Sequence, residues 1–193
     1  MGLEAPAADG EDRIATIPNV ISAVRLACVP LFLYLLLGIE ERRGAAILLA
    51  TLGATDWVDG YIARSRGAIT TFGKLMDPIA DKLLVVAALV SLVSLDRLPA
   101  WVAMVIIARE LAVTMSRMAA TGQGVVISAN RWGKAKTALQ VLTIFLLIAV
   151  NGSPAWLDVL VYLTVGVTVV SGVEYFFGLR RSLAARERSS AEA

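Results

Sequence analysis

Six apolar stretches, each about long enough to cross a lipid bilayer, constrain the fold of this chain more than any other feature. We place them at residues 20–39, 44–64, 74–95, 98–120, 134–151 and 155–178. A helix of about 20 residues spans the ~30 Å hydrocarbon core of a membrane. Hydrophobic residues make up 58% of the 193 residues, above the ~45–50% typical of soluble domains. We therefore predict an all-α, polytopic membrane protein with six transmembrane helices.

The basic residues predict how these helices are oriented. Most of the 18 Lys and Arg residues fall at the chain ends and in the second and fourth connections, whereas the other connections hold only Arg42, Arg43 and Arg97. Because Lys and Arg are enriched in cytoplasmic loops, both termini are expected in the cytoplasm. Three units follow from this arrangement: a disordered acidic tail over residues 1–13, a six-helix domain over 14–180 and a basic cytoplasmic tail over 181–193.

Four aspartates lie where the second and third apolar stretches approach the cytoplasmic side. They belong to two segments with a regular spacing: Asp56, Asp59, Gly60, Ala63 and Arg64, then, eight residues on, Gly73, Asp77 and Asp81. In a helix, the acids of each segment fall within an arc of roughly 100°. A charged side chain at the bilayer centre costs about 2.5–3.5 kcal/mol, so four unpaired carboxylates would cost on the order of 10 kcal/mol. Their charge must therefore be compensated.

Divalent cations are the compensation that this spacing favours. Clustered carboxylates bind hard cations, and two metals roughly 4 Å apart stabilise both sides of a phosphoryl displacement. Gly60 and Gly73 permit close approach of a ligand, and Arg64 can hold a phosphate with two hydrogen bonds. One alternative is a set of salt bridges with Arg64, Lys74 and Lys82 that only joins the helices. Another is a cation transporter, although acids at one depth do not form a path across the bilayer.

The His and Cys content of the sequence excludes several classes of catalytic and metal site. The sequence has no His and a single Cys, Cys28. Ser–His and Cys–His catalysis and His-ligated zinc are therefore excluded, and no disulfide can form within the chain. We expect no nucleic-acid partner.

The two acidic segments together resemble the complete signature of the CDP-alcohol phosphatidyltransferases. The signature is Asp-x-x-Asp-Gly-x-x-Ala-Arg, eight residues, then Gly-x-x-x-Asp-x-x-x-Asp, and every position is present from Asp56 to Asp81. The resemblance implies that residues 14–180 form a six-helix membrane enzyme, which moves a phosphatidyl group from CDP-diacylglycerol to an alcohol and releases CMP. It also implies a homodimer in the bacterial plasma membrane, with its active site facing the cytoplasm.

The resemblance also implies roles for individual residues. Asp56, Asp59, Asp77 and Asp81 would bind two divalent cations, Mg²⁺ or alternatively Mn²⁺, and Asp81 would also act as the general base toward the acceptor hydroxyl. Binding of CDP-diacylglycerol is expected at a wider set of positions: Asp56, Gly60, Ala63, Arg64, Thr70, Gly73, Asn19 and Arg25. For Asn19 and Arg25, a role at the helix end is an equal alternative.

Further stretches are similar to one subfamily, the phosphatidylglycerophosphate synthases. They are residues 17–25, 71–85, 108–112 and 133–140. The acceptor would then be sn-glycerol 3-phosphate, and its phosphate would be bound by Arg109, Arg117, Lys134 and Lys136. Alternatively, Arg109 pairs with Glu110 or with an aspartate, and the other three are solvated interface charges. A cardiolipin synthase or a phosphatidylinositol-phosphate synthase of the same family, each with a different acceptor, is the alternative function.

Overall fold

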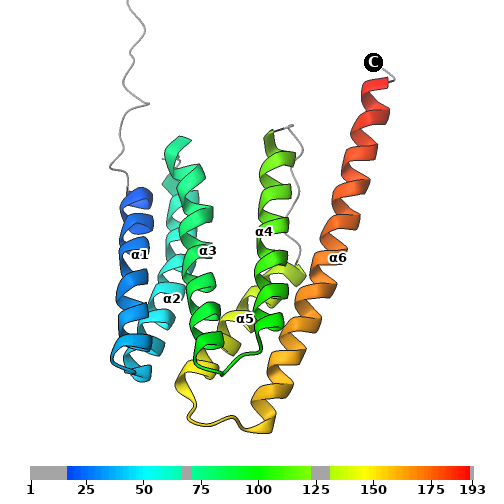
Figure 1. Cartoon of the computed structure of the whole chain (residues 1–193). Helices are drawn as coiled ribbons and strands as arrows, with labels where there is room; N and C mark the ends of the chain where they lie inside the picture. The colour runs from blue at the N-terminus through cyan, green and yellow to red at the C-terminus, as the bar shows by residue number, and fades with distance from the viewer. Residues whose placement is uncertain (1–16, 67–70, 123–130, 192–193) are drawn as a thin grey trace, which may run out of the picture.

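The described residues fold into a bundle of six α-helices that run up and down along one another (Figure 1). The computed structural model describes the backbone of residues 17–66, 71–122 and 131–191, and the side chains of residues 23–54, 82–122 and 136–184. The helices are α1 (Ile17–Leu33), continued by a π-helical turn η1 (Tyr34–Gly38), α2 (Arg42–Arg66), α3 (Thr71–Ser94), α4 (Ala100–Gly122), α5 (Arg131–Ala149) and α6 (Ala155–Ala191). Within the described ranges there is no β-strand, so the all-α prediction is confirmed.

Three of the connections reverse the chain through residues with left-handed backbone conformation. Glu40 (φ 54°) follows η1, Asp96 (φ 53°) follows α3 and Gly152 (φ 78°) follows α5. A left-handed residue commonly ends a helix because it turns the chain away from the helix axis. At the start of α2, the Gly44 N–H donates a hydrogen bond of 3.2 Å to the Glu41 carboxylate, which satisfies one of the free amides of the first turn.

Arg97 joins two of these connections. Its Nη2 donates hydrogen bonds to the carbonyl oxygens of Val150 (2.7 Å) and Gly152 (2.8 Å), so the α3–α4 turn holds the end of α5. Partial burial, and secondarily the positive charge of Arg42, lower the pKa of Arg97 from its ordinary value. The three connections predicted to lie on one side of the membrane therefore share one end of the bundle.

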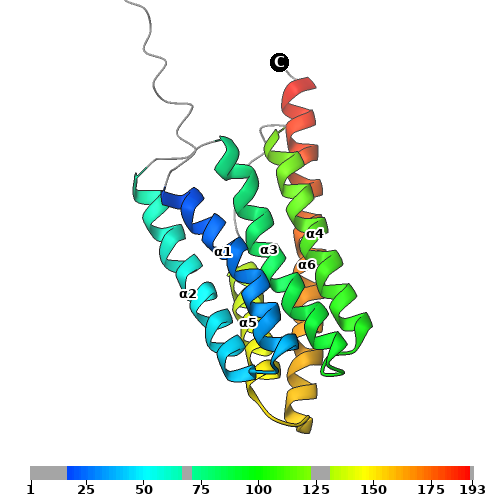
Figure 2. The same cartoon turned by 60° about the vertical axis from the view of Figure 1, so that its left-hand side comes forward.

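The apolar core lies between the halves of the helices that are nearest this end. It draws side chains from every helix, among them Phe32, Leu36, Leu89, Val102 and Ile148. Figure 2 shows α1 beside α2 and α3, and contacts between these helices join the first half of the bundle. The second half is joined by contacts of α6 with α4 and α5.

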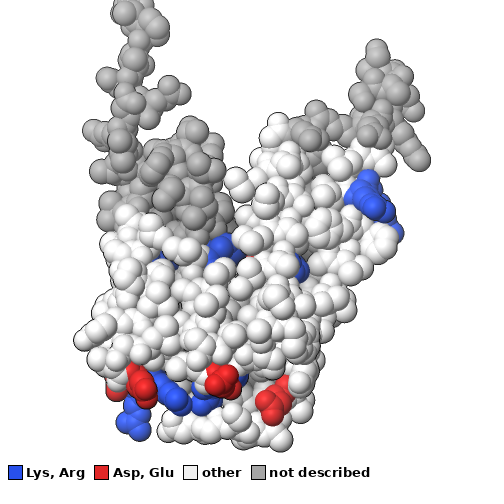
Figure 3. All heavy atoms as spheres, viewed as in Figure 1, with Lys and Arg blue, Asp and Glu red and all other residues white. Residues whose placement is uncertain are grey.

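The outer surface of the bundle carries many large apolar side chains. Ile47, Met104, Met115 and Val170 are each more than 60% exposed. Figure 3 shows an uncharged band between a lower rim of Lys, Arg, Asp and Glu and a few Lys and Arg groups above it. By length and composition, one helix among the described residues, Ala155–Ala184, could cross a membrane. Three shorter apolar helical stretches accompany it: Ala23–Gly38, Lys82–Ser94 and Lys136–Ala149.

The sixth helix is longer than its apolar stretch. We predicted a span over residues 155–178 followed by a basic tail, and α6 continues as one helix through this Arg-rich segment to Ala191. Figure 1 shows that α1 begins and α6 ends at the same end of the bundle, opposite the turn between α3 and α4. The acidic N-terminal tail predicted for residues 1–13 lies outside the described residues.

Candidate active site

The two acidic segments lie at adjoining ends of α2 and α3. Residues 56–64 fall in the last three turns of α2, and residues 73–81 fall in the first three turns of α3. The helical conformation predicted for both segments is therefore confirmed. Asp56 and Asp59 are three residues apart and Asp77 and Asp81 are four apart, spacings that place each pair on one face of its helix. Four carboxylates on two joined helix ends are an oxygen donor set of the kind that Mg²⁺ and Mn²⁺ prefer, so the residues present fit a divalent metal.

The roles predicted for the side chains of this motif remain predictions. Thr70 lies outside the described residues, as do the side chains of the other predicted substrate and metal ligands on α1, α2, α3 and α5: Asn19, Asp56, Asp59, Gly60, Ala63, Arg64, Gly73, Asp77, Asp81 and Lys134. Arg25 is described, and it is buried within α1 with 5% of its surface exposed.

A buried ion-pair cluster connects α3, α4 and α5. At its centre is Glu110 of α4, whose side chain is 6% exposed. Glu110 Oε1 accepts from Arg109 Nη1 (3.2 Å) and from Lys136 Nζ of α5, and Oε2 accepts from Lys82 Nζ of α3. We call these four residues the Glu110 cluster. Because Lys82 directly follows Asp81, the cluster begins one residue from the acidic motif.

The Glu110 cluster holds more positive than negative charge. Arg109 and Lys136 both donate to the same oxygen of one carboxylate, and the Lys136 side chain is only 3% exposed. Burying charged groups is costly unless each has a partner of opposite sign. Among the described residues, the buried Lys136 and the half-buried Arg109 share one carboxylate, which leaves positive charge that an anionic ligand would neutralise.

Helix α6 fixes Arg109 from the other side. Arg109 Nη2 donates to Ser171 Oγ at 3.1 Å, and the Ser171 hydroxyl donates to the carbonyl oxygen of Thr168 at 3.0 Å. The next residue is Gly172, where a Cβ atom would lie 3.2 Å from Arg109 Cγ. The absence of a side chain there lets the Arg109 stem lie directly against the α6 backbone.

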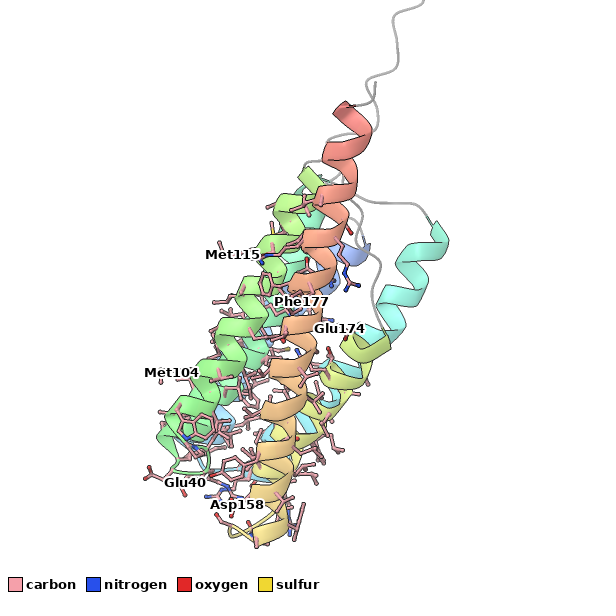
Figure 4. The ribbon with its side chains drawn as sticks, turned by 90° about the vertical axis from the view of Figure 1, so that its right-hand side faces the viewer. Glu40, Met104, Met115, Asp158, Glu174 and Phe177 are labelled. Carbon is pink, nitrogen blue, oxygen red and sulfur yellow. The ribbon has the colours of Figure 1, made fainter. Side chains whose placement is uncertain are left out.

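Arg117, two turns further along α4, also contacts α6. Its guanidinium carbon lies 5.7 Å from the ring centroid of Tyr175, a cation–π distance. The Tyr175 hydroxyl is buried and has no hydrogen-bond partner among the described residues. Figure 4 shows Met115 of α4 and Phe177 of α6 far along the bundle from Glu40 and Asp158, which lie near its opposite end.

The structure thus brings two of the four predicted acceptor-phosphate residues together and places a third along the same helix. Arg109 and Lys136 meet on Glu110, and Arg117 lies on α4 beside Tyr175. The contact between Arg109 and Glu110, predicted as an alternative, is present, and Lys136 contacts the same carboxylate.

The sequence did not predict that Glu110 is a shared partner of these cations, nor that Ser171 and Tyr175 contact α4. An acid beside a cation inside an apolar stretch was a signal for Glu110, whereas no pattern links Ser171 or Tyr175 to α4.

Comparison with known proteins shows which family the chain belongs to. The family model of the CDP-alcohol phosphatidyltransferases matches residues 15–170. The chain belongs to this family. It is accordingly an enzyme, a phosphatidyltransferase of phospholipid biosynthesis, as the acidic signature predicted. The family is membrane-bound, in agreement with the apolar surface of the bundle.

Named relatives cover most of the chain. It is 42% identical to the CDP-diacylglycerol–glycerol-3-phosphate 3-phosphatidyltransferase of Bacillus subtilis, over 83% of this chain and 93% of the relative. It is 39% identical to a probable phosphatidylglycerophosphate synthase of Mycobacterium tuberculosis, over 86% of this chain and 82% of the relative. A CMP-forming cardiolipin synthase of Streptomyces coelicolor is 43% identical, but over 51% of this chain and 48% of its own length.

Proposed function

We propose that this enzyme transfers the phosphatidyl group of CDP-diacylglycerol to sn-glycerol 3-phosphate, giving phosphatidylglycerol phosphate and CMP. The relatives that match over most of the chain are named for this reaction, whereas the cardiolipin synthase matches over about half of it. The alternative acceptors, phosphatidylglycerol and inositol phosphate, are therefore ranked below glycerol 3-phosphate.

The observation that carries this proposal is the Glu110 cluster. It sets Arg109 and Lys136 in one ion-pair network with Lys82, the residue that follows Asp81. An acceptor with its own phosphate needs a cationic site close to the group that activates its hydroxyl. The bundle provides cations on α4 and α5 and links them to the motif helix α3, which suits a small phosphorylated alcohol.

The reaction then needs one in-line displacement. The acceptor hydroxyl oxygen attacks the phosphorus that carries the diacylglycerol, its proton passes to Asp81, and the bond from that phosphorus to the CMP oxygen breaks. Divalent cations held by Asp56, Asp59, Asp77 and Asp81, two Mg²⁺ or alternatively Mn²⁺, would neutralise charge on the diphosphate. Gly60, Ala63, Arg64, Thr70 and Gly73 would bind the CDP-diacylglycerol headgroup, and Asn19 and Arg25 would add contacts from α1. Arg109, Arg117, Lys134 and Lys136 would bind the acceptor phosphate.

The same proposal places the bundle in the bacterial plasma membrane with six spans. Exposed apolar side chains on successive helices, such as Ile47, Met104 and Val170, support this placement, because a surface of this kind is stable in lipid. The motif ends of α2 and α3 and both termini would face the cytoplasm, where glycerol 3-phosphate is available. A second copy of the chain is the expected partner, as a homodimer.

The test is release of CMP by the purified protein with CDP-diacylglycerol and Mg²⁺, comparing glycerol 3-phosphate, phosphatidylglycerol and inositol phosphate side by side. Glycerol 3-phosphate should support the fastest release, and Asp81→Asn should abolish turnover while some nucleotide binding remains. Asp158→Asn makes the same chemical change at the opposite end of the bundle and should retain activity. Faster release with phosphatidylglycerol would identify a cardiolipin synthase instead. Ion flux into proteoliposomes without CMP release would favour the transporter.

A further inference from the structure

We propose that Glu110 is a positioning residue, which sets the acceptor-phosphate cations at a fixed place relative to the metal-binding motif. This inference rests on the proposed function, because it assigns Arg109 and Lys136 to the acceptor phosphate. Glu110 itself would touch neither the lipid nor the acceptor. It would act through the cations that it holds.

The first argument is how the carboxylate is used. Both Glu110 oxygens accept from cations, and the partners come from three different helices: Lys82 of α3, Arg109 of α4 and Lys136 of α5. A single carboxylate therefore sets the separation between the helix that carries Asp77 and Asp81 and the two helices that carry the acceptor cations.

The second argument is electrostatic. Neutralising a buried carboxylate takes one cation, and Lys136 alone, which is almost fully buried, would be sufficient. Arg109 instead adds a second positive charge on the same oxygen and is itself held in place by Ser171. Two basic groups on one carboxylate oxygen are more than the neutralisation of that acid requires, whereas they suit the recognition of a doubly charged phosphate.

The third argument concerns what happens without the carboxylate. An amide at position 110 can accept a hydrogen bond but cannot offset the repulsion between Arg109 and Lys136 in a buried site. The two cations would move apart, and the acceptor phosphate would lose its aligned donors. CDP-diacylglycerol binding, which depends on residues of α2 and the start of α3, would change much less.

The test is steady-state kinetics of Glu110→Gln and Glu110→Asp with each substrate varied in turn. Glu110→Gln should raise the KM for glycerol 3-phosphate roughly tenfold, a coupling typical of contacting charged residues, and leave the KM for CDP-diacylglycerol within about twofold. Glu110→Asp keeps the charge and should recover a large part of the loss. If Glu110→Gln lowers only the amount of active protein and leaves both KM values unchanged, Glu110 merely joins the helices and the proposal is wrong.

Two controls separate positioning from stability. Thr164→Val removes a buried hydrogen bond of 2.7 Å between Thr143 of α5 and Thr164 of α6, and should lower thermal stability without moving the acceptor KM. The double variant Glu110→Gln/Lys136→Met should raise the acceptor KM by less than the product of the two single effects, because Glu110 acts partly through that lysine. Additive effects would overturn the proposal. The same assay on the wild-type protein tests the proposed function separately. If the wild-type protein does not use glycerol 3-phosphate, the proposed function is refuted.

Discussion

Replacing Gly172 by alanine should weaken acceptor binding without weakening the fold. The added Cβ would lie 3.2 Å from Arg109 Cγ and 3.6 Å from Arg109 Nε. Carbon atoms pack best at about 3.5–4.0 Å, so the Arg109 stem must move away by a few tenths of an ångström. Its hydrogen bonds to Glu110 (3.2 Å) and Ser171 (3.1 Å) are already at the long end of the normal range, and the shift lengthens them further.

The magnitude follows from these two hydrogen bonds. Each contributes about 0.5–1.5 kcal/mol, so weakening both should cost about 1 kcal/mol of acceptor binding, roughly a fivefold rise in KM. Against this, alanine is favoured over glycine in a helix interior by ~0.8–1 kcal/mol. The thermal midpoint of Gly172→Ala should therefore stay close to that of the wild type while acceptor affinity falls.

The assay is the KM for glycerol 3-phosphate together with the thermal midpoint, and α6 provides matched controls. A Cβ at Gly166 or Gly178 would have no atom within 4 Å, so Gly166→Ala and Gly178→Ala make the same helix change without touching Arg109. Both controls should keep the wild-type KM. The reasoning fails if Gly172→Ala has the same acceptor KM as these controls, or if its KM for CDP-diacylglycerol rises equally.

Three further predictions concern other parts of the bundle. Arg97→Met removes the hydrogen bonds to Val150 and Gly152 and should lower stability by about 1–2 kcal/mol, measured as a thermal midpoint lower by a few degrees, with unchanged acceptor KM. Tyr175→Leu removes the ring beneath Arg117, worth about 0.5–1 kcal/mol, and should raise the acceptor KM two- to fivefold. Tyr175→Phe keeps the ring and should stay within about twofold, so equal effects of the two changes would contradict the contact. Chelation with EDTA should stop CMP release and added Mg²⁺ should restore it; activity that survives chelation would remove the two-metal assignment.

The helices could be predicted from the sequence because each is a nearly continuous apolar run between charged or turn-forming residues. The predicted stretch 44–64 corresponds to α2 (Arg42–Arg66), and 134–151 corresponds to α5 (Arg131–Ala149). The end of α6 was less predictable. Its Arg-rich segment marks the end of an apolar span, but Arg, Ala, Leu and Glu are good helix formers, so the helix itself continues to Ala191.

The acidic motif was visible in the sequence because its spacing lies within two neighbouring helices. The Glu110 cluster was not, because its partners are far apart along the chain: Lys136 is 26 residues from Glu110, Lys82 is 28 residues away, and Ser171 is 62 residues from Arg109. No local pattern encodes such pairs, since they depend on how α3, α4, α5 and α6 pack. Sequence reasoning could name the cations, but only the packing shows that they share one carboxylate.

In the proposed acceptor site, a carboxylate on its own would repel the phosphate, and the arrangement around Glu110 resolves that conflict. At about 4 Å, two like charges near a protein surface repel by roughly 4 kcal/mol at an effective dielectric constant of 20. Without an acid, Arg109 and Lys136 would bear this repulsion whenever the acceptor is absent. Glu110 offsets part of it, so the cations stay close together and aligned. Because one carboxylate cannot neutralise both, positive charge would remain for the phosphate of the acceptor to neutralise. In the proposed site, Glu110 would thus hold the two cations together while leaving part of their charge available to a small dianion.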